Sequence, residues 1–170
     1  MQYKYYELDN RQEFLSKVCT LEYKQGDEDE AKALGFPSVS FLYHNTFAPY
    51  MKYYIVEDNE KNIICTIVLR RDGSLEYFIT NHLTANKVPT MVRTMKQLAD
   101  ETTAKVDVVF TTTLESYEGA ISFNEMVGFR KIKTDGKFST WAYDKNYVNP
   151  NDGILSIEQP KRTKKKKVEE

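Results

Sequence analysis

The chain has 170 residues, of which 41% are hydrophobic and 13% aromatic, and its 24 Lys and Arg nearly balance its 25 Asp and Glu, for a formal charge of -1. This length suits one domain with its own core, and the apolar content excludes a wholly disordered chain. The near-zero charge excludes a strong overall attraction to polyanions.

The first ten residues, MQYKYYELDN, lack the apolar core of a signal peptide, and no stretch is long and apolar enough to span a bilayer. The two cysteines, Cys19 and Cys65, lack the spacing typical of a zinc site or a disulfide framework, so we expect reduced structural thiols. These features predict a cytoplasmic protein without a metal site or a membrane partner.

The N-terminal part of the chain predicts a strand followed by helices. Aromatic and polar residues alternate over residues 2–8, which is typical of a strand. Asp9 or Asn10 then caps a predicted helix that reaches residue 21. Residues 26–49 begin with an acidic run and become aromatic without a clean period, which predicts a broken helix.

The middle of the chain predicts three antiparallel strands and a helix. Residues 50–58, 62–71 and 75–80 are β-branched and aromatic runs, separated by Asp-Asn-Glu-Lys and Asp-Gly turn sequences. Pro89 suits the first turn of a helix, whose apolar face continues to about Glu101.

The last third of the predicted domain adds three strands and one helix. Residues 106–113 are typical of a central strand, and residues 114–127 contain helical apolar spacing that Gly128 ends as a C-cap. Residues 129–132 and 138–143 then pair around an Asp-Gly turn. The complete order predicts an α/β fold with a mixed, mostly antiparallel sheet flanked by helices.

The C-terminal residues differ in composition from the rest of the chain. Residues 148–170 contain no aromatic residue, several turn formers, six Lys and Arg, and four Asp and Glu. We therefore expect a domain over residues 1–147 and a basic, disordered tail over residues 148–170. The KRTKKKK run suits weak, non-specific contact with nucleic acid, or it only keeps the chain in solution.

The element order and the segment AISFNEMVGFRKI, residues 120–132, resemble the GNAT acetyltransferase superfamily over residues 1–145. The segment matches the family's C-terminal signature of a helix, a Gly-Phe pair and a strand. The resemblance implies a GNAT-like sheet, acetyl-CoA as cofactor, and transfer of an acetyl group to an amine substrate.

The resemblance also implies a phosphate-binding loop after the fourth strand, where closely spaced glycines expose backbone N–H groups. The matching stretch, TNHLTANKVPTM, contains no glycine, and Pro89 lacks an N–H group. We therefore expect an eroded acetyl-CoA site. Lys87 is either a point charge for a phosphate or a solvated residue. The candidate cofactor-binding residues of the strand and loop are Phe78, Ile79, Asn86, Lys87 and Thr90.

Three residues are candidates for the catalytic roles that the resemblance implies. The general acid of the family is a tyrosine four residues before the Gly-Phe pair, where this chain has Asn124. An amide cannot deliver a proton, so the role of acid has to pass to Tyr117 or to another phenol elsewhere in the site. Glu76 stands where the family keeps the base, unless it lies on the solvent face of its strand.

The departures from the family pattern leave three functions open. The first is an N-acetyltransferase with an eroded site, whose acceptor amine the sequence does not identify. The second is a non-catalytic structural or binding protein, similar to GNAT-like virion-associated proteins of tailed bacteriophages, which would place it in a virion. The third is an adaptor whose basic tail docks on nucleic acid or on an acidic protein partner.

Overall fold

Four antiparallel strands form the first sheet in the order β1-β2-β3-β4. The computed structural model describes residues 2–46 and 51–144, so the predicted tail lies outside the described residues. Both predicted turn sequences join neighbouring strands, as expected. The strands are β1 (Lys4–Leu8), β2 (Lys52–Glu57), β3 (Ile63–Leu69) and β4 (Leu75–Ile79).

Three helices cover one face of this sheet: α1 (Arg11–Val18), α2 (Gln25–Ala33) and α3 (Val39–Asn45). The side chain of Asn10 caps α1 by accepting the backbone N–H of Glu13, as the sequence predicted. The predicted broken helix is thus two helices, because Gly35, at a φ of +99°, follows the first one.

Aromatic rings form the core beneath these helices. The ring of Tyr43 packs edge-on against Phe14 at 5.0 Å and against Phe78 at 5.5 Å. Its hydroxyl shares a hydrogen bond of 2.7 Å with that of Thr66. The buried side of β3 and β4 is therefore fixed against α1 and α3.

The opposite face of the sheet is covered by α4 (Val88–Thr103), which follows a single 3-10 turn, η1 (Ala85–Lys87). Its buried side includes Met91, Met95 and Leu98, the apolar face that the sequence predicted, and the helix continues two residues beyond Glu101. None of the helices among the described residues is long and apolar enough to cross a membrane.

The second sheet has three antiparallel strands in the order β5-β7-β6, with α5 (Glu118–Val127) packed beside it. The strands are β5 (Val109–Leu114), β6 (Arg130–Asp135) and β7 (Phe138–Tyr143). Gly128 caps α5 at a φ of +115°, and its N–H donates to the carbonyl of Asn124, which confirms the predicted C-cap.

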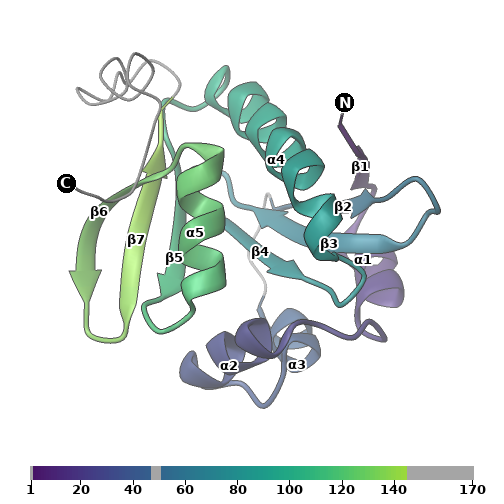
Figure 1. Ribbon diagram of the computed structural model, residues 1–170. Coiled ribbons are helices and arrows are strands. Elements are labelled where there is room, and N and C mark those ends of the chain that lie inside the picture. Colours follow the sequence, from purple (N-terminus) through teal and green to yellow (C-terminus); the bar gives the residue numbers. More distant parts are fainter. Residues whose placement is uncertain (1, 47–50, 145–170) are drawn as a thin grey trace.

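The two sheets meet at β4 and β5, which do not form a continuous ladder. A single parallel bridge joins Ser74 to Phe110, and the N–H of Phe110 donates to the carbonyl of Gly73 at 2.9 Å. A Cβ atom on Gly73 would lie 2.4 Å from the carbonyl oxygen of Val108, so glycine permits this close approach. Beyond the bridge the two strands diverge (Figure 1). The mixed α/β architecture predicted from the sequence is confirmed.

Candidate active site

A cavity of about 440 Å³ lies between the diverging end of β4, the segment that leads into α4, and α5. Its volume is within the range of small-molecule sites, and most of its wall is apolar. Its lining residues are Lys24, Asp27, Tyr77, Ile79, Leu83, Ala85, Val88, Tyr117, Gly119, Ala120, Phe123 and Met126.

Asp27 and Tyr117 meet at the inner end of this cavity. The hydroxyl of Tyr117 donates to Oδ2 of Asp27 at 2.9 Å. Asp27 is only 3% exposed, and burial raises its pKa well above the usual range, although the Tyr117 hydroxyl and the nearby backbone of Ile79 oppose the shift. Burial and the neighbouring Asp27 likewise raise the pKa of Tyr117, so its hydroxyl remains a donor.

Glu30 lies one turn after Asp27 on the same side of α2. Its Oε1 accepts the backbone N–H of Leu114 at 3.2 Å. Burial raises the pKa of Glu30 to about 7, and the charge of Glu76 acts in the same direction. Glu30 therefore binds the backbone of β5, and Asp27 lies beside β4 near Ile79, so α2 spans the two strands where their ladder is interrupted.

Glu30 also borders a second cavity, of about 240 Å³, together with Glu76. The side chain of Glu76 is only 19% exposed, so it does not lie on an open solvent face. Within the described residues its Oε1 is buried without a hydrogen bond, and the nearest cation, Nη2 of Arg70, is 4.0 Å away. Burial raises the pKa of Glu76, although Arg70 opposes the shift. Two carboxyl groups thus face one small cavity.

Asn124, the residue at the family's general-acid position, has no solvent exposure. Its Oδ1 accepts the hydroxyl of Tyr77 at 2.6 Å, and its Nδ2 donates to Oγ1 of Thr113 at 2.9 Å. These contacts join α5 to β4 and to β5. The structure therefore places Asn124 under the cavity as a polar link between three elements.

The two predicted cofactor-binding residues of β4 lie on opposite sides of the strand. Ile79 lines the cavity of 440 Å³, as does Tyr77 two residues before it. Phe78 points to the other side, where its ring packs against Tyr23 and Tyr43. The alternation of a strand thus separates two neighbouring candidates.

The three predicted cofactor-binding residues after β4 make contacts within the protein. The Nζ atom of Lys87 donates to Oδ2 of Asp58 at 2.6 Å, which ties the loop to the β2–β3 turn. Oδ1 of Asn86 accepts the hydroxyl of Thr84 at 2.6 Å. Thr90 is buried in the first turn of α4. None of the three lines the cavity, so their contact with a cofactor stays a prediction.

Sequence reasoning did not single out Asp27, Glu30 or Tyr77. The first two belong to the acidic run DEDE, which was interpreted only as the start of a helix. Their spacing of three residues places both on one side of a helix and is the signal that was available. Within residues 2–46 and 51–144, no three His, Cys, Asp or Glu side chains are grouped to hold a metal ion.

No curated protein and no family model matches the sequence, but solved structures resemble it. A chimera of the spermidine N-acetyltransferase of Vibrio cholerae and hSSAT is 14% identical, with a TM-score of 0.59 over 85% of this chain and 96% of that one. The Vibrio cholerae enzyme in complex with CoA and spermine is 15% identical, with a TM-score of 0.58 and the same coverage. A dodecameric form of the enzyme is 13% identical, with a TM-score of 0.55 over 94% of this chain and 99% of that one. The chain therefore has the GNAT fold, as its resemblance to that superfamily predicted.

Proposed function

We propose that this protein is an N-acetyltransferase that transfers an acetyl group from acetyl-CoA to an amine. The observation that carries the proposal is the interrupted ladder between β4 and β5, with a cavity of about 440 Å³ at the diverging end of β4. A structural neighbour from Vibrio cholerae was solved with CoA and spermine, which supports this pair of ligands.

The cavity of 440 Å³ suits acetyl-CoA because its wall is mostly apolar and reaches the β4 backbone at Ile79. Leu83, Val88 and Phe123 would hold the apolar part of the molecule. When bound, acetyl-CoA supplies an acyl carbon that is activated as a thioester. The site is eroded where the family binds the phosphates: the stretch that leads into α4 contains no glycine, and Pro89 in its first turn offers no N–H to a phosphate.

The smaller cavity suits the amine. Glu30 and Glu76 border it, and the buried Oε1 of Glu76 lacks a hydrogen bond among the described residues. An ammonium group would give this oxygen a charged donor and offset the cost of its burial. Asp27, which lines the larger cavity, lies one helical turn before Glu30, so α2 connects the two cavities.

Proton transfer would be divided between Glu30 and Tyr117, with Glu76 binding the amine. The pKa of about 7 lets Glu30 accept the amine proton at neutral pH, which makes it a better candidate base than an ordinary carboxylate. The new carbon–nitrogen bond replaces the carbon–sulfur bond, and the departing thiolate needs a proton. Tyr117 is the candidate acid because its protonated hydroxyl lies in the larger cavity.

A second candidate function, ligand binding without catalysis, is favoured by one observation. The stretch that leads into α4 contains no glycine, and Pro89 offers no N–H to a phosphate, so this segment lacks the backbone donors that a coenzyme would use. The predicted association with a phage virion is a special case of this function and rests on the sequence resemblance.

Calorimetric titration with acetyl-CoA and with CoA tests the proposal, followed by an assay of thiol release with spermidine, spermine and a simple primary amine. We expect acetyl-CoA to bind and an amine to be acetylated. Ala85→Trp should block binding, because the exposed Ala85 lines the cavity. Ala104→Trp, at an exposed residue beyond α4, is the matched control.

Binding without turnover would support the non-catalytic candidate. Absence of acetyl-CoA binding, or equal binding by Ala85→Trp, would remove the proposal.

A further inference from the structure

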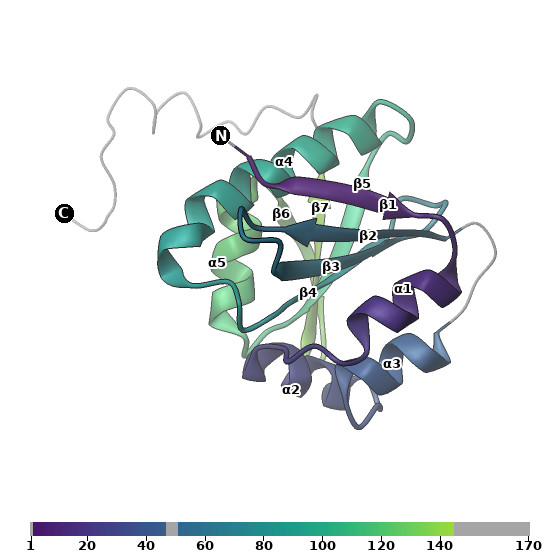
Figure 2. The ribbon, with the colours of Figure 1, turned by 90° about the vertical axis from the view of Figure 1, so that its right-hand side faces the viewer.

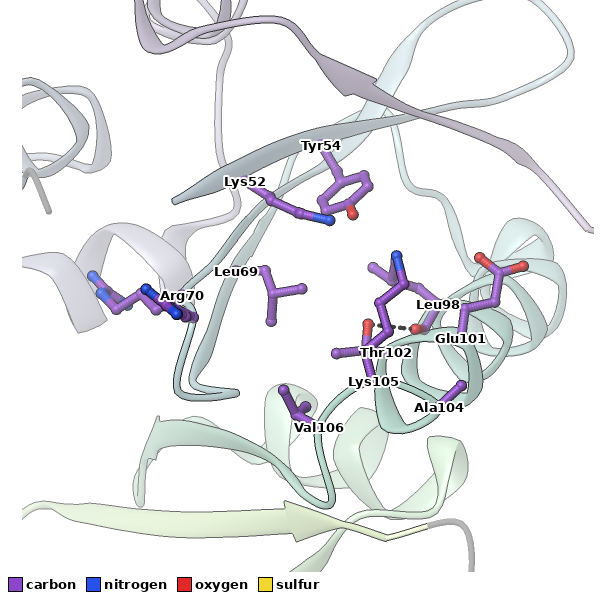
Figure 3. A pocket seen from close by; sticks show the side chains of 11 residues that line it. Lys52, Tyr54, Leu69, Arg70, Leu98, Glu101, Thr102, Ala104, Lys105 and Val106 are labelled. Atoms are coloured by element: carbon purple, nitrogen blue, oxygen red, sulfur yellow. Dashed lines mark hydrogen bonds between the residues drawn. The ribbon is translucent and has the colours of Figure 1, made fainter. Parts of the chain in front are cut away.

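A third cavity, of about 590 Å³, lies between the first sheet and the C-terminal end of α4 (Figure 3). It is formed by β2, the end of β3, and the last turn of α4 with the residues that follow it. The acetyl-CoA candidate cavity adjoins the first turn of the same helix. At 1.5 Å per residue the two ends of α4 are roughly 20 Å apart, so the two cavities are separate.

The floor of this cavity is apolar. Leu69 and Leu98 are buried in the hydrophobic core between the first sheet and α4, and Val106 packs against the same core. In Figure 3, Leu69 and Leu98 lie on opposite sides of the space, and Val106 lies at its lower edge. An apolar group placed there would lose its contact with water, which is favourable in proportion to the area covered.

Two lysines provide positive charge from opposite walls. Lys52 comes from β2 and Lys105 follows α4, and Figure 3 shows both amino groups pointing into the space near the hydroxyl of Tyr54. In the part of the chain that the structure describes, neither ammonium group makes an ion pair or a hydrogen bond. Burial raises the pKa of Tyr54 to about 12, so its hydroxyl is a neutral donor.

The single carboxylate of the wall, Glu101, is held by other groups. Its Oε1 accepts the hydroxyl of Tyr5, and its Oε2 accepts Nε2 of Gln97 at 3.0 Å. Glu101 makes no ion pair within the described residues. The two lysine charges are therefore not neutralised by the acid beside them.

We propose that this cavity binds an organic anion with an apolar body, a carboxylate or a phosphate monoester. The acidic group lies between Lys52 and Lys105 and accepts the hydroxyl of Tyr54, while the apolar body covers Leu69 and Leu98. A cationic amine is repelled from this cavity. This cavity is independent of acetyl transfer, because it lies at the opposite end of α4 and binds an anion rather than a cationic amine.

Calorimetric titration of the full chain with four probes of equal chain length tests the proposal: octanoate, octyl phosphate, octanol and octylamine. We expect the two anions to bind and octanol and octylamine to bind at least about tenfold more weakly, a difference of about 1.4 kcal/mol. The tighter of the two anions identifies the acidic group that the cavity prefers.

Two substitutions locate the binding. Lys52→Gln with Lys105→Gln should weaken the binding of the preferred anion by about tenfold or more, whereas Lys133→Gln, at an exposed lysine of β6, should not change it. Ala104→Trp fills this cavity and should block the anion, while Ala85→Trp should not. Octylamine binding as tightly as octanoate, no binding of either anion, or anion binding unchanged in the double lysine variant would overturn the proposal.

Discussion

The hydroxyl of Tyr117 lies 2.9 Å from the carboxylate of Asp27, although 90 residues separate them in the sequence. The contact lies where β4 and β5 diverge, beside Ile79 of β4. One turn later on the same helix, Glu30 accepts the N–H of Leu114 at the end of β5. Helix α2 therefore supplies a side-chain acceptor to β5 in the place where a continuous sheet would supply a backbone carbonyl.

Replacing Tyr117 with Phe tests this contact. The substitution removes the hydroxyl that donates to the buried Asp27, so we expect the free energy of unfolding to fall by about 1 kcal/mol at pH 7. If Tyr117 is the acid, kcat should fall while KM for the amine changes little. Urea unfolding and the thiol-release assay measure these effects.

Tyr5→Phe is the matched control, because it removes a hydroxyl that binds Glu101 far from this site. If Tyr117→Phe had the same unfolding free energy and the same kcat as the wild type, the Tyr117 hydroxyl would contribute to neither stability nor catalysis.

Glu30 should make the protein less stable as pH rises. Its pKa is 4.5 in an ordinary environment and about 7 in the folded protein. Between these values the folded protein keeps a proton that the unfolded chain has lost. The contribution of Glu30 to the free energy of unfolding is therefore full below about pH 4.5 and disappears as pH rises through 7. For this group alone, the free energy of unfolding decreases by about 3 kcal/mol across that interval.

Glu30→Gln should reduce this slope, because the amide oxygen still accepts the N–H of Leu114 but does not titrate. Urea unfolding at pH 5 and pH 8 measures the slope, and Glu118→Gln, at an exposed residue of α5, should keep that of the wild type. Asp27 adds a contribution of the same sign, so some slope remains in Glu30→Gln. Equal slopes for Glu30→Gln and the wild type would contradict the assigned environment of Glu30.

Local signals in the sequence predicted most of the fold. The Asp-Gly turn at Gly73, the first-turn proline at Pro89 and the C-cap at Gly128 each act through the conformation of a few neighbouring residues. The number of helices between β1 and β2 was less clear, because the aromatic residues of α3 form no regular buried stripe: Tyr43 is buried, whereas Phe41 is exposed.

The site was predicted less completely because its contacts join distant parts of the chain. Glu30 and Leu114 are 84 residues apart, and no local pattern shows that a helix supplies an acceptor to a strand so far along the chain. The alternation of β4 separated Ile79 from Phe78 only once the sheet position was known. Tyr117 was identified by residue type alone, and its partner Asp27 was not.

Gly26 should resist replacement although it lies in a helix. A Cβ atom there would lie 2.3 Å from Cε1 of Tyr117, so the ring must move. Gly26→Ala should therefore destabilise the protein, whereas the same change at a solvent-exposed position inside a helix stabilises the folded state by about 1 kcal/mol. In a Tyr117→Leu background the Cβ atom has space, and Gly26→Ala should then be stabilising. Thermal unfolding of the four proteins gives the interaction energy, and additive effects would show that the ring and the glycine do not interact.

Asn124 should be required for stability and should not accept the family's tyrosine. Its side chain has no exposure, so Asn124→Tyr inserts extra volume into a closed space and should cost about 1–3 kcal/mol. Because that space is already bounded by Tyr77 and Thr113, we expect no gain in acetyl transfer. A soluble Asn124→Tyr protein with higher kcat and unchanged stability would show that position 124 reaches the reaction centre.

Asn124→Leu separates the hydrogen bonds of this side chain from its volume. Leucine is of similar size but leaves the buried hydroxyl of Tyr77 without its acceptor, so the free energy of unfolding should fall by about 2 kcal/mol. Adding Tyr77→Phe removes the unpaired hydroxyl, and the double variant should be more stable than the sum of the two single changes predicts. Urea unfolding of the single and double variants checks this. If the effects of Asn124→Leu and Tyr77→Phe on the free energy of unfolding simply add, the hydrogen bond between Asn124 and Tyr77 does not stabilise the packing of α5 against β4.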